Sequence, residues 1–178
     1  MSPLSQLRVR EIGRVMSTDD IIPGRYKHMF TDTSELATHI FENALPGFAA
    51  SAREGDVLCS VATFGIGSSR EQAVSSLQAA GIRAVIAPSF GRIFFRNAWN
   101  LGLIAIELDQ LPTREGDLID IDLGRGAVTG GFGEARFAPP PPEMLDMVAQ
   151  GGLLAMIAKR RNSPEARSVS NGSLENAS

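Results

Sequence analysis

The residues best suited to chemistry lie in the segment FGIGSSRE, residues Phe64–Glu71. Its two glycines allow a sharp turn and a close approach of a ligand to the backbone. A helix that begins here would offer free N–H groups and a partial positive charge to an anion. Arg70 would add a bidentate donor for a carboxylate or a phosphate. A capped turn with an exposed arginine explains the same spacing equally well, so the segment by itself leaves anion binding open.

Ser68 in this segment is a candidate base or nucleophile. A serine hydroxyl is too weakly acidic for either role at neutral pH, unless a helix N-terminus and Arg70 supply a positive environment. The alternative is that Ser68 or Ser69 caps the helix. Familiar motifs do not apply, because the segment lacks the Walker lysine, the third glycine of the dinucleotide fingerprint and the Gly-x-Ser-x-Gly elbow of hydrolases.

A second polar segment, STDDIIPGRYKHM, is predicted to be a loop because its Pro-Gly pair interrupts any helix. It carries two carboxylates and three basic residues: Asp19, Asp20, Arg25, Lys27 and His28. Composition alone favours an ordinary solvated loop. The functional interpretation is that one carboxylate orients the arginine of the first segment, while the basic groups bind the substrate.

Regular elements must position these two segments. Apolar runs predict strands over residues 56–64, 84–87 and 103–108, and the mixed apolar and charged segment 7–15 predicts a short strand. Helical spacing predicts helices over 33–42, after Ser68 and after Ser89. The order β-α-β-α-β over 56–108 implies parallel strands joined by right-handed crossovers. Alternation over 117–123 and 127–129 predicts an antiparallel hairpin, and Pro142 can open a final helix. We therefore expect an α/β fold with a parallel core and an antiparallel accessory sheet.

Length and charge limit the class of protein. The chain has 178 residues with 17 Lys and Arg against 20 Asp and Glu, which suits one domain over residues 1–161 and a polar, disordered tail over 162–178. The net charge of −3 argues against nucleic acid as the main partner. The chain has no apolar run of membrane-spanning length and no signal-like N-terminus, so we expect no membrane partner and a cytoplasmic location.

Cysteine and histidine content argues against a metal centre built by this chain alone. The single cysteine, Cys59, excludes an internal disulfide, a thiolate zinc site and a self-contained iron–sulfur cluster. Cys59 stands in an apolar strand and is expected to be an inert core thiol. His28 and His39 are eleven residues apart without a ligand pattern, and we expect His39 to be structural or solvated.

Three segments in a fixed order carry a family resemblance: STDDIIPGRY, FGIGSSREQA and GIRAVIAPSFGRIFFRNAWNLGLIAIEL. Together they resemble the small subunit of isopropylmalate isomerase and of its homoaconitase and dimethylmalate dehydratase relatives, the swivelling domain of the aconitase superfamily. The likeness runs from about Val9 to Arg161. It implies a three-layer β/β/α swivelling domain with a central parallel sheet. It also implies a partner, an aconitase-type large subunit that carries a [4Fe–4S] cluster. This chain would close over that cluster.

The same resemblance implies roles for individual residues. Ser68 would be the catalytic base that removes a proton from the carbon beside a carboxylate, and Ser69 and Arg70 would bind the substrate. Asp19, matched through the STD segment, would complete the site beside Arg70. The implied activity is dehydration and rehydration of a 2-hydroxy dicarboxylate such as isopropylmalate.

The YKHM part of the polar segment departs from the family patterns, which are apolar for an isopropyl group and carry an arginine for an extra carboxylate. Lys27 and His28 therefore suggest a polar or anionic substituent on the substrate, and Arg25 joins them as a predicted substrate contact. Two alternatives stay open: a homoaconitate- or dimethylmalate-type small subunit, and a non-catalytic swivelling interaction module. The combination of a serine base, an arginine and a carboxylate argues against the module.

Overall fold

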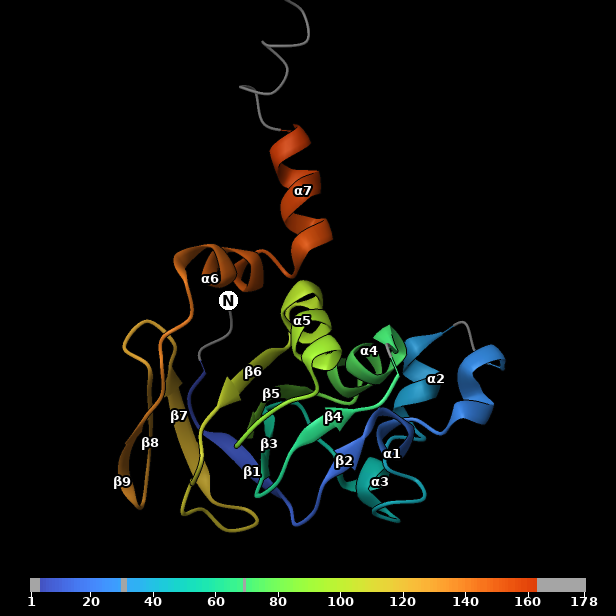
Figure 1. Cartoon of the computed structure of the whole chain (residues 1–178), viewed down its shortest axis with the longest axis horizontal. Helices are drawn as coiled ribbons and strands as arrows, with labels where there is room; N and C mark the ends of the chain where they lie inside the picture. The colour runs from blue at the N-terminus through green and yellow to red at the C-terminus, as the bar shows by residue number, and fades with distance from the viewer. Residues whose placement is uncertain (1–3, 30–31, 69, 163–178) are drawn as a thin grey trace, which may run out of the picture.

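The computed structural model describes residues 4–29, 32–68 and 70–162, and its centre is a seven-stranded sheet (Figure 1). The strand order is β6-β5-β3-β1-β7-β8-β9. Four neighbouring strands are parallel: β1 (Leu7–Ile12), β3 (Asp56–Ser60), β5 (Ile82–Ala87) and β6 (Ile104–Glu107). The other three pair antiparallel: β7 (Leu118–Asp122), β8 (Ala127–Gly130) and β9 (Gly133–Arg136).

The burial pattern along the strands explains this division. Every residue of β3 is buried, as expected for a central strand covered on both faces. In β7, Ile119 and Ile121 are buried while the residues between and beside them are more exposed, as in a strand with one solvated face. The α/β class is confirmed. The antiparallel strands do not form a separate accessory sheet, because β7 pairs directly with β1 through Leu7 and Ile119 and so continues the same sheet.

A second, two-stranded sheet lies apart from the first. It pairs β2 (Met16–Ser17) with β4 (Phe64–Ile66) in parallel. The predicted strand 7–15 thus ends at Ile12 and a new strand follows it. The predicted strand 56–64 ends at Ser60, whose hydroxyl bonds within a tight turn to the carbonyl of Ala62. This small sheet brings the two polar segments together.

Two crossover helices connect the parallel strands and pack against each other: α4 (Glu71–Ala79) and α5 (Arg92–Leu101). Each buries an apolar face, which in α5 consists of Phe94, Ala98 and Trp99. Their N-caps are Arg70 and Gly91, without a side-chain capping bond. The prediction that Ser68 caps the first helix is therefore wrong, and Ser69 lies outside the described residues. The helix predicted after Ser89 begins at Arg92, and the Ser89 hydroxyl bonds that of Thr63.

Short helices surround the small sheet, at the end of the molecule opposite the β7–β9 edge (Figure 1). They are α1 (Thr18–Ile21), a 3₁₀ helix η1 (Gly24–His28), α2 (Thr33–Ala37) and α3 (Phe48–Ser51). The predicted loop over the polar segment is therefore largely helical. The cause is a capping box, in which the Ser17 hydroxyl accepts from the Asp20 amide and the Asp20 carboxylate accepts from the Ser17 amide. The predicted helix 33–42 ends at Ala37.

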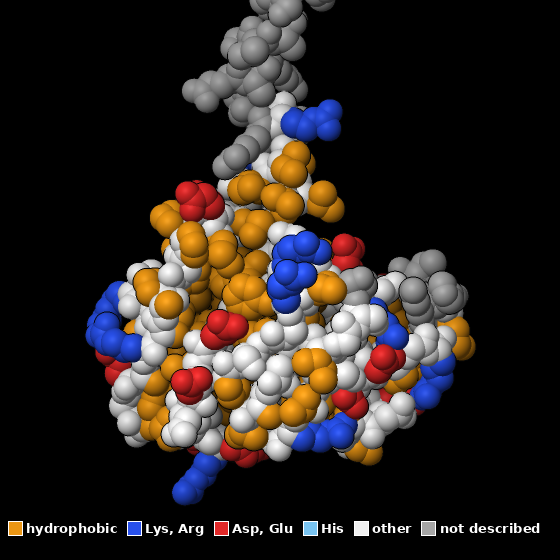
Figure 2. Space-filling model, in the orientation of Figure 1, with side chains coloured by type: hydrophobic (Ala, Val, Ile, Leu, Met, Phe, Trp, Pro, Cys, Tyr) orange, Lys and Arg blue, Asp and Glu red, His pale blue; other side chains and the backbone are white. Residues whose placement is uncertain are grey.

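Two C-terminal helices, α6 (Pro142–Ala149) and α7 (Leu153–Asn162), lie beyond α5. Figure 2 shows hydrophobic side chains around α6 and the base of α7, where Leu154 and Ile157 are exposed. Most of the predicted tail, residues 163–178, lies outside the described residues. Within residues 4–29, 32–68 and 70–162, no helix has both the length and the apolar character needed to span a membrane.

Candidate active site

The two polar segments meet through the parallel pairing of β2 and β4. Met16 pairs with Phe64 and Ser17 with Ile66, so α1 and the turn before α4 leave the small sheet side by side. The Thr18 hydroxyl then donates to the carbonyl of Ser68 at 3.2 Å. Because the strands are parallel, the residues that follow each of them lie at the same end of the sheet, and this places Asp19 near Arg70.

Arg70 and Asp19 form an ion pair at this end. Nη1 of Arg70 lies 2.7 Å from Oδ1 of Asp19, and the same nitrogen donates to the carbonyl of Ile22 at 3.0 Å. The Arg70 side chain is 16% exposed and that of Asp19 is 59% exposed. The guanidinium is therefore held from one side, and part of it still faces solvent.

Asp20, next in sequence, has a different role. Its carboxylate completes the capping box and lies 3.0 Å from Nη2 of Arg14. Burial raises the pKa of this carboxyl, but hydrogen bonds from Ser17 and the charge of Arg14 lower it by more, so the pKa lies below its ordinary value. Of the two adjacent carboxylates, one thus caps a helix and the other is paired with Arg70.

Glycines allow the close approach of these segments. A Cβ on Gly24 would lie 3.3 Å from both Arg70 Nη2 and Asp19 Oδ1, so a larger residue would press on the ion pair. Gly65 has φ +75°, and a Cβ there would come within 2.3 Å of the Phe94 ring. Gly65 therefore serves the backbone turn and its packing against α5, and Gly67, with φ +103°, serves the turn beside Thr18.

Ser68 is exposed and stands three residues before the first helical residue, Glu71. Its carbonyl accepts from the Arg70 amide at 3.0 Å as well as from Thr18. The free N–H groups at the start of α4 and the Arg70 guanidinium lie close by in the chain, which is the positive environment that a serine base requires. Ser69 lies outside the described residues.

The basic residues of the second segment are placed less uniformly. Arg25 is directed to Glu42, with which it forms an ion pair, and to the Tyr26 hydroxyl at 3.2 Å. Lys27 and His28 lie in η1, and their side chains are outside the described part of the chain. The structure therefore brings Asp19 and Arg70 together beside Ser68, and it places Arg25 on a neighbouring carboxylate.

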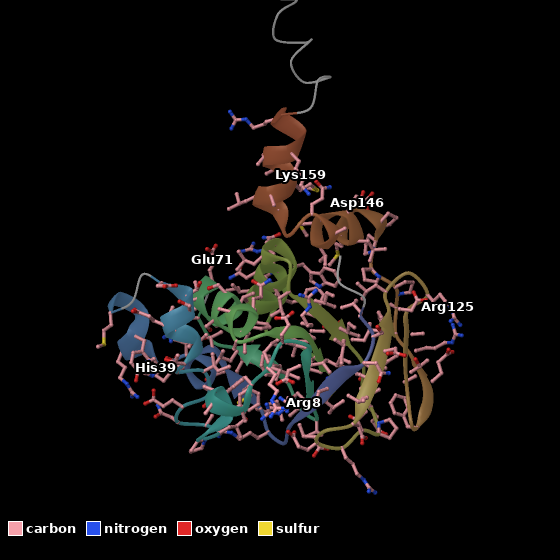
Figure 3. All side chains as sticks on the ribbon, turned by 180° about the vertical axis from the view of Figure 1, so that it is seen from behind. Arg8, His39, Glu71, Arg125, Asp146 and Lys159 are labelled. Carbon is pink, nitrogen blue, oxygen red and sulfur yellow. The ribbon has the colours of Figure 1, made fainter. Side chains whose placement is uncertain are left out.

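Sequence reasoning missed Thr18 and Glu42. The capping-box pattern Ser-Thr-Asp-Asp was a usable signal for the first, because it predicts a helical turn that begins at Thr18. For Glu42 a weaker signal existed in its spacing of three from His39, whose Nδ1 lies 2.8 Å from the Glu42 carboxylate. Figure 3 shows His39 at the α2 end of the molecule, across from Arg125 on the β7–β9 edge.

Comparison with known proteins identifies the family. The family model described as the aconitase C-terminal domain matches residues 12–111, which include both polar segments. The chain belongs to this family.

The relatives of this aconitase-type domain share nearly its whole length. A 3-isopropylmalate dehydratase small subunit from Archaeoglobus fulgidus is 44% identical over 85% of this chain and 93% of its own length. A homoaconitase small subunit from Thermus thermophilus is 39% identical over 88% of this chain and 98% of its own length. The crystal structure of 3-isopropylmalate dehydratase from Methanocaldococcus jannaschii has a TM-score of 0.81 and 37% identity, and covers 92% of this chain and 96% of that one.

The residues of this aconitase-type domain do not fit an iron–sulfur cluster. Its single thiol, Cys59, is buried in β3, and that burial raises the pKa of the thiol to about 12, which disfavours the thiolate that binds iron. In the described ranges no three His, Cys, Asp or Glu side chains form a group that could hold a metal ion.

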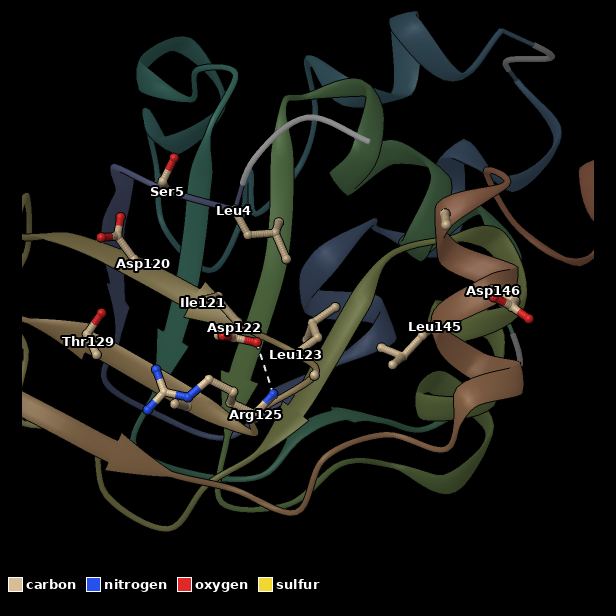
Figure 4. Close-up of a pocket in the computed structure, with 13 residues that line it drawn as sticks. Leu4, Ser5, Asp120, Ile121, Asp122, Leu123, Arg125, Thr129, Leu145 and Asp146 are labelled. Carbon is tan, nitrogen blue, oxygen red and sulfur yellow. Dashed lines mark hydrogen bonds between the residues drawn. The ribbon is translucent and has the colours of Figure 1, made fainter.

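A cavity of about 670 Å³ lies away from the site, between the β7–β8 strands and α6 (Figure 4). Asp122 accepts there from the Arg125 amide at 2.9 Å. The lining of this cavity includes neither Ser68 nor the Arg70–Asp19 pair. In the candidate site of the aconitase-type domain, Ser68 and Asp19 are exposed.

Proposed function

We propose that this chain is the small subunit of a two-subunit hydro-lyase that dehydrates and rehydrates a 2-hydroxy dicarboxylate of the isopropylmalate type. The observation that carries the proposal is the Arg70–Asp19 ion pair beside the exposed Ser68, at the N-terminus of α4. Two relatives that bear the name of 3-isopropylmalate dehydratase small subunit cover 85% and 89% of this chain.

In this proposal Arg70 binds the carboxylate next to the carbon that loses its proton. The electron pair of the breaking C–H bond delocalises onto that carboxylate, where Arg70 and the helix N–H groups stabilise the added charge. Ser68, as its alkoxide, accepts the proton and becomes a neutral hydroxyl. The C=C bond forms as the C–O bond on the neighbouring carbon breaks, and the departing hydroxide takes up a proton from an acid of the partner subunit or from solvent to give water. Rehydration in the opposite sense gives the isomer. Asp19 holds the guanidinium in place through its ion pair with Nη1 of Arg70.

The remainder of the active site is assigned to a partner. Ser68 is exposed, and the Asp19 side chain is more than half exposed. A reaction that expels water from a carbanion-like transition state benefits from an enclosed, dry site. We therefore assign the closing surface, and the [4Fe–4S] cluster that the chain cannot ligate, to an aconitase-type large subunit, and we place the assembly in the cytoplasm without nucleic acid or membrane partners.

Isopropylmalate is the leading substrate because 3-isopropylmalate dehydratase small subunits stand among the relatives. A homoaconitase small subunit of comparable identity makes homoaconitate the main alternative, and a dimethylmalate-type substrate is a further one. The basic residues Lys27 and His28 favour a substrate with a polar or anionic substituent.

The test combines this chain with a candidate large subunit and follows the absorbance of the enoate product. Activity is expected from the mixture and from neither chain alone. Ser68→Ala should lower kcat by about 10³-fold, as loss of a general base does, while Ser75→Ala on α4 serves as the matched control. Full activity of Ser68→Ala would remove the base assignment. Association without turnover of any hydroxy acid would favour the non-catalytic module, and the ratio of kcat/KM between isopropylmalate and homoaconitate decides the substrate.

A further inference from the structure

Glu42 is the meeting point of three side chains from two segments. Its Oε2 accepts from the Tyr26 hydroxyl at 2.6 Å and lies 2.8 Å from His39 Nδ1, and its Oε1 accepts from Arg25. The Tyr26 ring stacks on the His39 ring with 4.2 Å between centroids. The Arg25 guanidinium also lies over the Tyr26 ring, 4.7 Å from its centroid. Hydrogen bonds from Tyr26 and His39, together with the charge of Arg25, keep the pKa of the Glu42 carboxyl below its ordinary value.

The backbone next to Glu42 is held in an unusual conformation. Phe41 has φ +56°, in the left-handed region that a bulky residue rarely adopts. Its side chain is fully buried and packs edge-on against Phe48 at 4.9 Å, and its amide donates to the carbonyl of Ile21 at 2.9 Å. The core thus holds Phe41 in place, and its conformation sets the direction in which the chain continues into Glu42.

The contacts of Glu42 lead directly to the candidate site. Tyr26 is 8% exposed and belongs to η1, which begins at Gly24. Gly24 is the residue that lies against both Arg70 and Asp19. The carbonyl of Ile22, two residues before Gly24, accepts a hydrogen bond from Arg70. The position of η1 therefore sets how closely residues 22–24 approach the Arg70 guanidinium. The hydrogen bond between Tyr26 and Glu42 holds η1 on the side away from Arg70.

We propose that Glu42 is a positioning residue of this site: it anchors η1 through Tyr26 and Arg25, and so keeps residues 22–24 seated on the Arg70–Asp19 pair. This inference rests on the proposed function for its effect on substrate binding. It assigns Arg25 to the anchor, with its charge compensated by Glu42. Glu42 acts through η1 and Arg70, so its loss weakens binding of the substrate carboxylate in the ground state and the transition state alike.

The kinetic test uses the reconstituted complex with Glu42→Gln, which keeps the shape of the side chain and removes its charge. We expect KM to rise about tenfold with kcat unchanged within about twofold, as loss of a charge-assisted anchor of uniform binding does. Glu35→Gln, an exposed glutamate on α2, is the matched control and should keep the parental KM. Tyr26→Phe should raise KM in the same way, and the double variant should be no worse than the poorer single variant, because both remove the same contact.

A second measurement does not depend on activity. Tyr26 is the only tyrosine, so the chain labelled with ¹³C at the tyrosine ring carbon that bears oxygen gives one NMR signal. Glu42→Gln should move that signal, and Glu35→Gln should not.

The outcomes are separable. An active parental complex in which Glu42→Gln leaves KM unchanged, or lowers kcat only in step with the folded fraction, overturns the inference. A parental complex that converts no hydroxy acid overturns the proposed function instead. In that case the tyrosine signal decides on the anchor by itself, and an unmoved signal in Glu42→Gln overturns it.

Discussion

The guanidinium of Arg70 is bound on one side by Asp19, whose Oδ1 lies 2.7 Å from Nη1. The two residues come from segments that lie far apart in the sequence. The same nitrogen also donates to the carbonyl of Ile22, so both contacts of Nη1 are made within this chain. Among the residues that the structure describes, the other donors of Arg70 have no hydrogen-bond partner, so they can meet a planar anion such as a substrate carboxylate.

Asp19→Asn should lower activity and spare stability, whereas Asp20→Asn should lower stability and spare activity. Asp19 is exposed and paired with Arg70, so its neutralisation should lower kcat/KM about 10- to 100-fold and leave the melting temperature nearly unchanged. Asp20 belongs to the capping box, so its substitution should cost about 1 kcal/mol of folding free energy with little effect on kcat/KM. Kinetics and thermal unfolding of both variants check this pair, and equal loss of activity in both would contradict the division of roles.

Gly24→Ala should disturb the site without straining the backbone. The added Cβ would lie 3.3 Å from Arg70 and from Asp19, closer than an ordinary van der Waals contact. We expect KM to rise several-fold, because Arg70 or Asp19 must shift to make room. The shift is smaller than the 1 Å misplacement that can cost about a hundredfold. Gly13→Ala, where a Cβ would meet nothing within 4 Å, is the control. Identical KM values for the two alanine variants would rule out a role for Gly24 in seating Arg70.

Thr18→Val should impair the turn that carries Ser68. Thr18 is 1% exposed, and its hydroxyl donates to the Ser68 carbonyl at 3.2 Å. Valine keeps the shape and removes one hydrogen bond, worth about 1 kcal/mol. We expect kcat to fall about fivefold because the serine is less well positioned, with a smaller change in KM. A variant with parental kcat but a lower melting temperature would show that Thr18 serves the fold alone.

Acid should weaken the fold through Asp56. This carboxylate is buried, 2.7 Å from Nε of Arg8 and 3.1 Å from Nη1 of Arg10. Burial raises its pKa, but hydrogen bonds from Arg8, a backbone amide and Arg10 lower it by more, so the folded-state pKa lies below the ordinary value.

The sign of the pH effect follows from that lowered pKa. The charged carboxylate contributes its full stability above the unfolded-state pKa of about 3.9, and this contribution is lost as the pH falls through the lower folded-state pKa. Asp56→Asn should cost about 3 kcal/mol at neutral pH, because it removes the counter-charge of Arg8 and leaves the buried Arg10 with the exposed Glu115 as its remaining carboxylate partner. Urea unfolding between pH 3 and 7 should then show a flatter pH profile for the variant; parallel profiles for variant and parent would contradict this account.

Cys59 should be unreactive in the folded chain. Its thiol is buried, and burial raises its pKa to about 12, so little thiolate exists at neutral pH. Labelling with iodoacetamide at pH 8 should proceed only after unfolding in guanidinium chloride. Rapid labelling of the folded protein would mean that this thiol is accessible to a partner or a metal, against the assignment of the cluster to the large subunit.

The sequence by itself determined the alternation of strands and helices over residues 56–108 and the polar character of the two site segments. Buried parallel strands are continuous apolar runs, and helix faces repeat at 3.6 residues, so local pattern suffices for both. The motif resemblance also singled out Asp19 from its neighbour Asp20. Spacing could not have made that choice, because two adjacent carboxylates differ only in what they contact.

Tertiary structure decided the rest. The β2–β4 pair joins residues about 48 positions apart, and a two-residue strand has too little pattern to be predicted from its own sequence. The antiparallel strands joined the main sheet through β1 and β7, which no local signal specifies. Glu42 meets Tyr26 because Phe41 adopts a left-handed conformation, which its burial in the core and its hydrogen bond to Ile21 stabilise. Pairing, strain and burial are non-local, and they determined which polar residues meet.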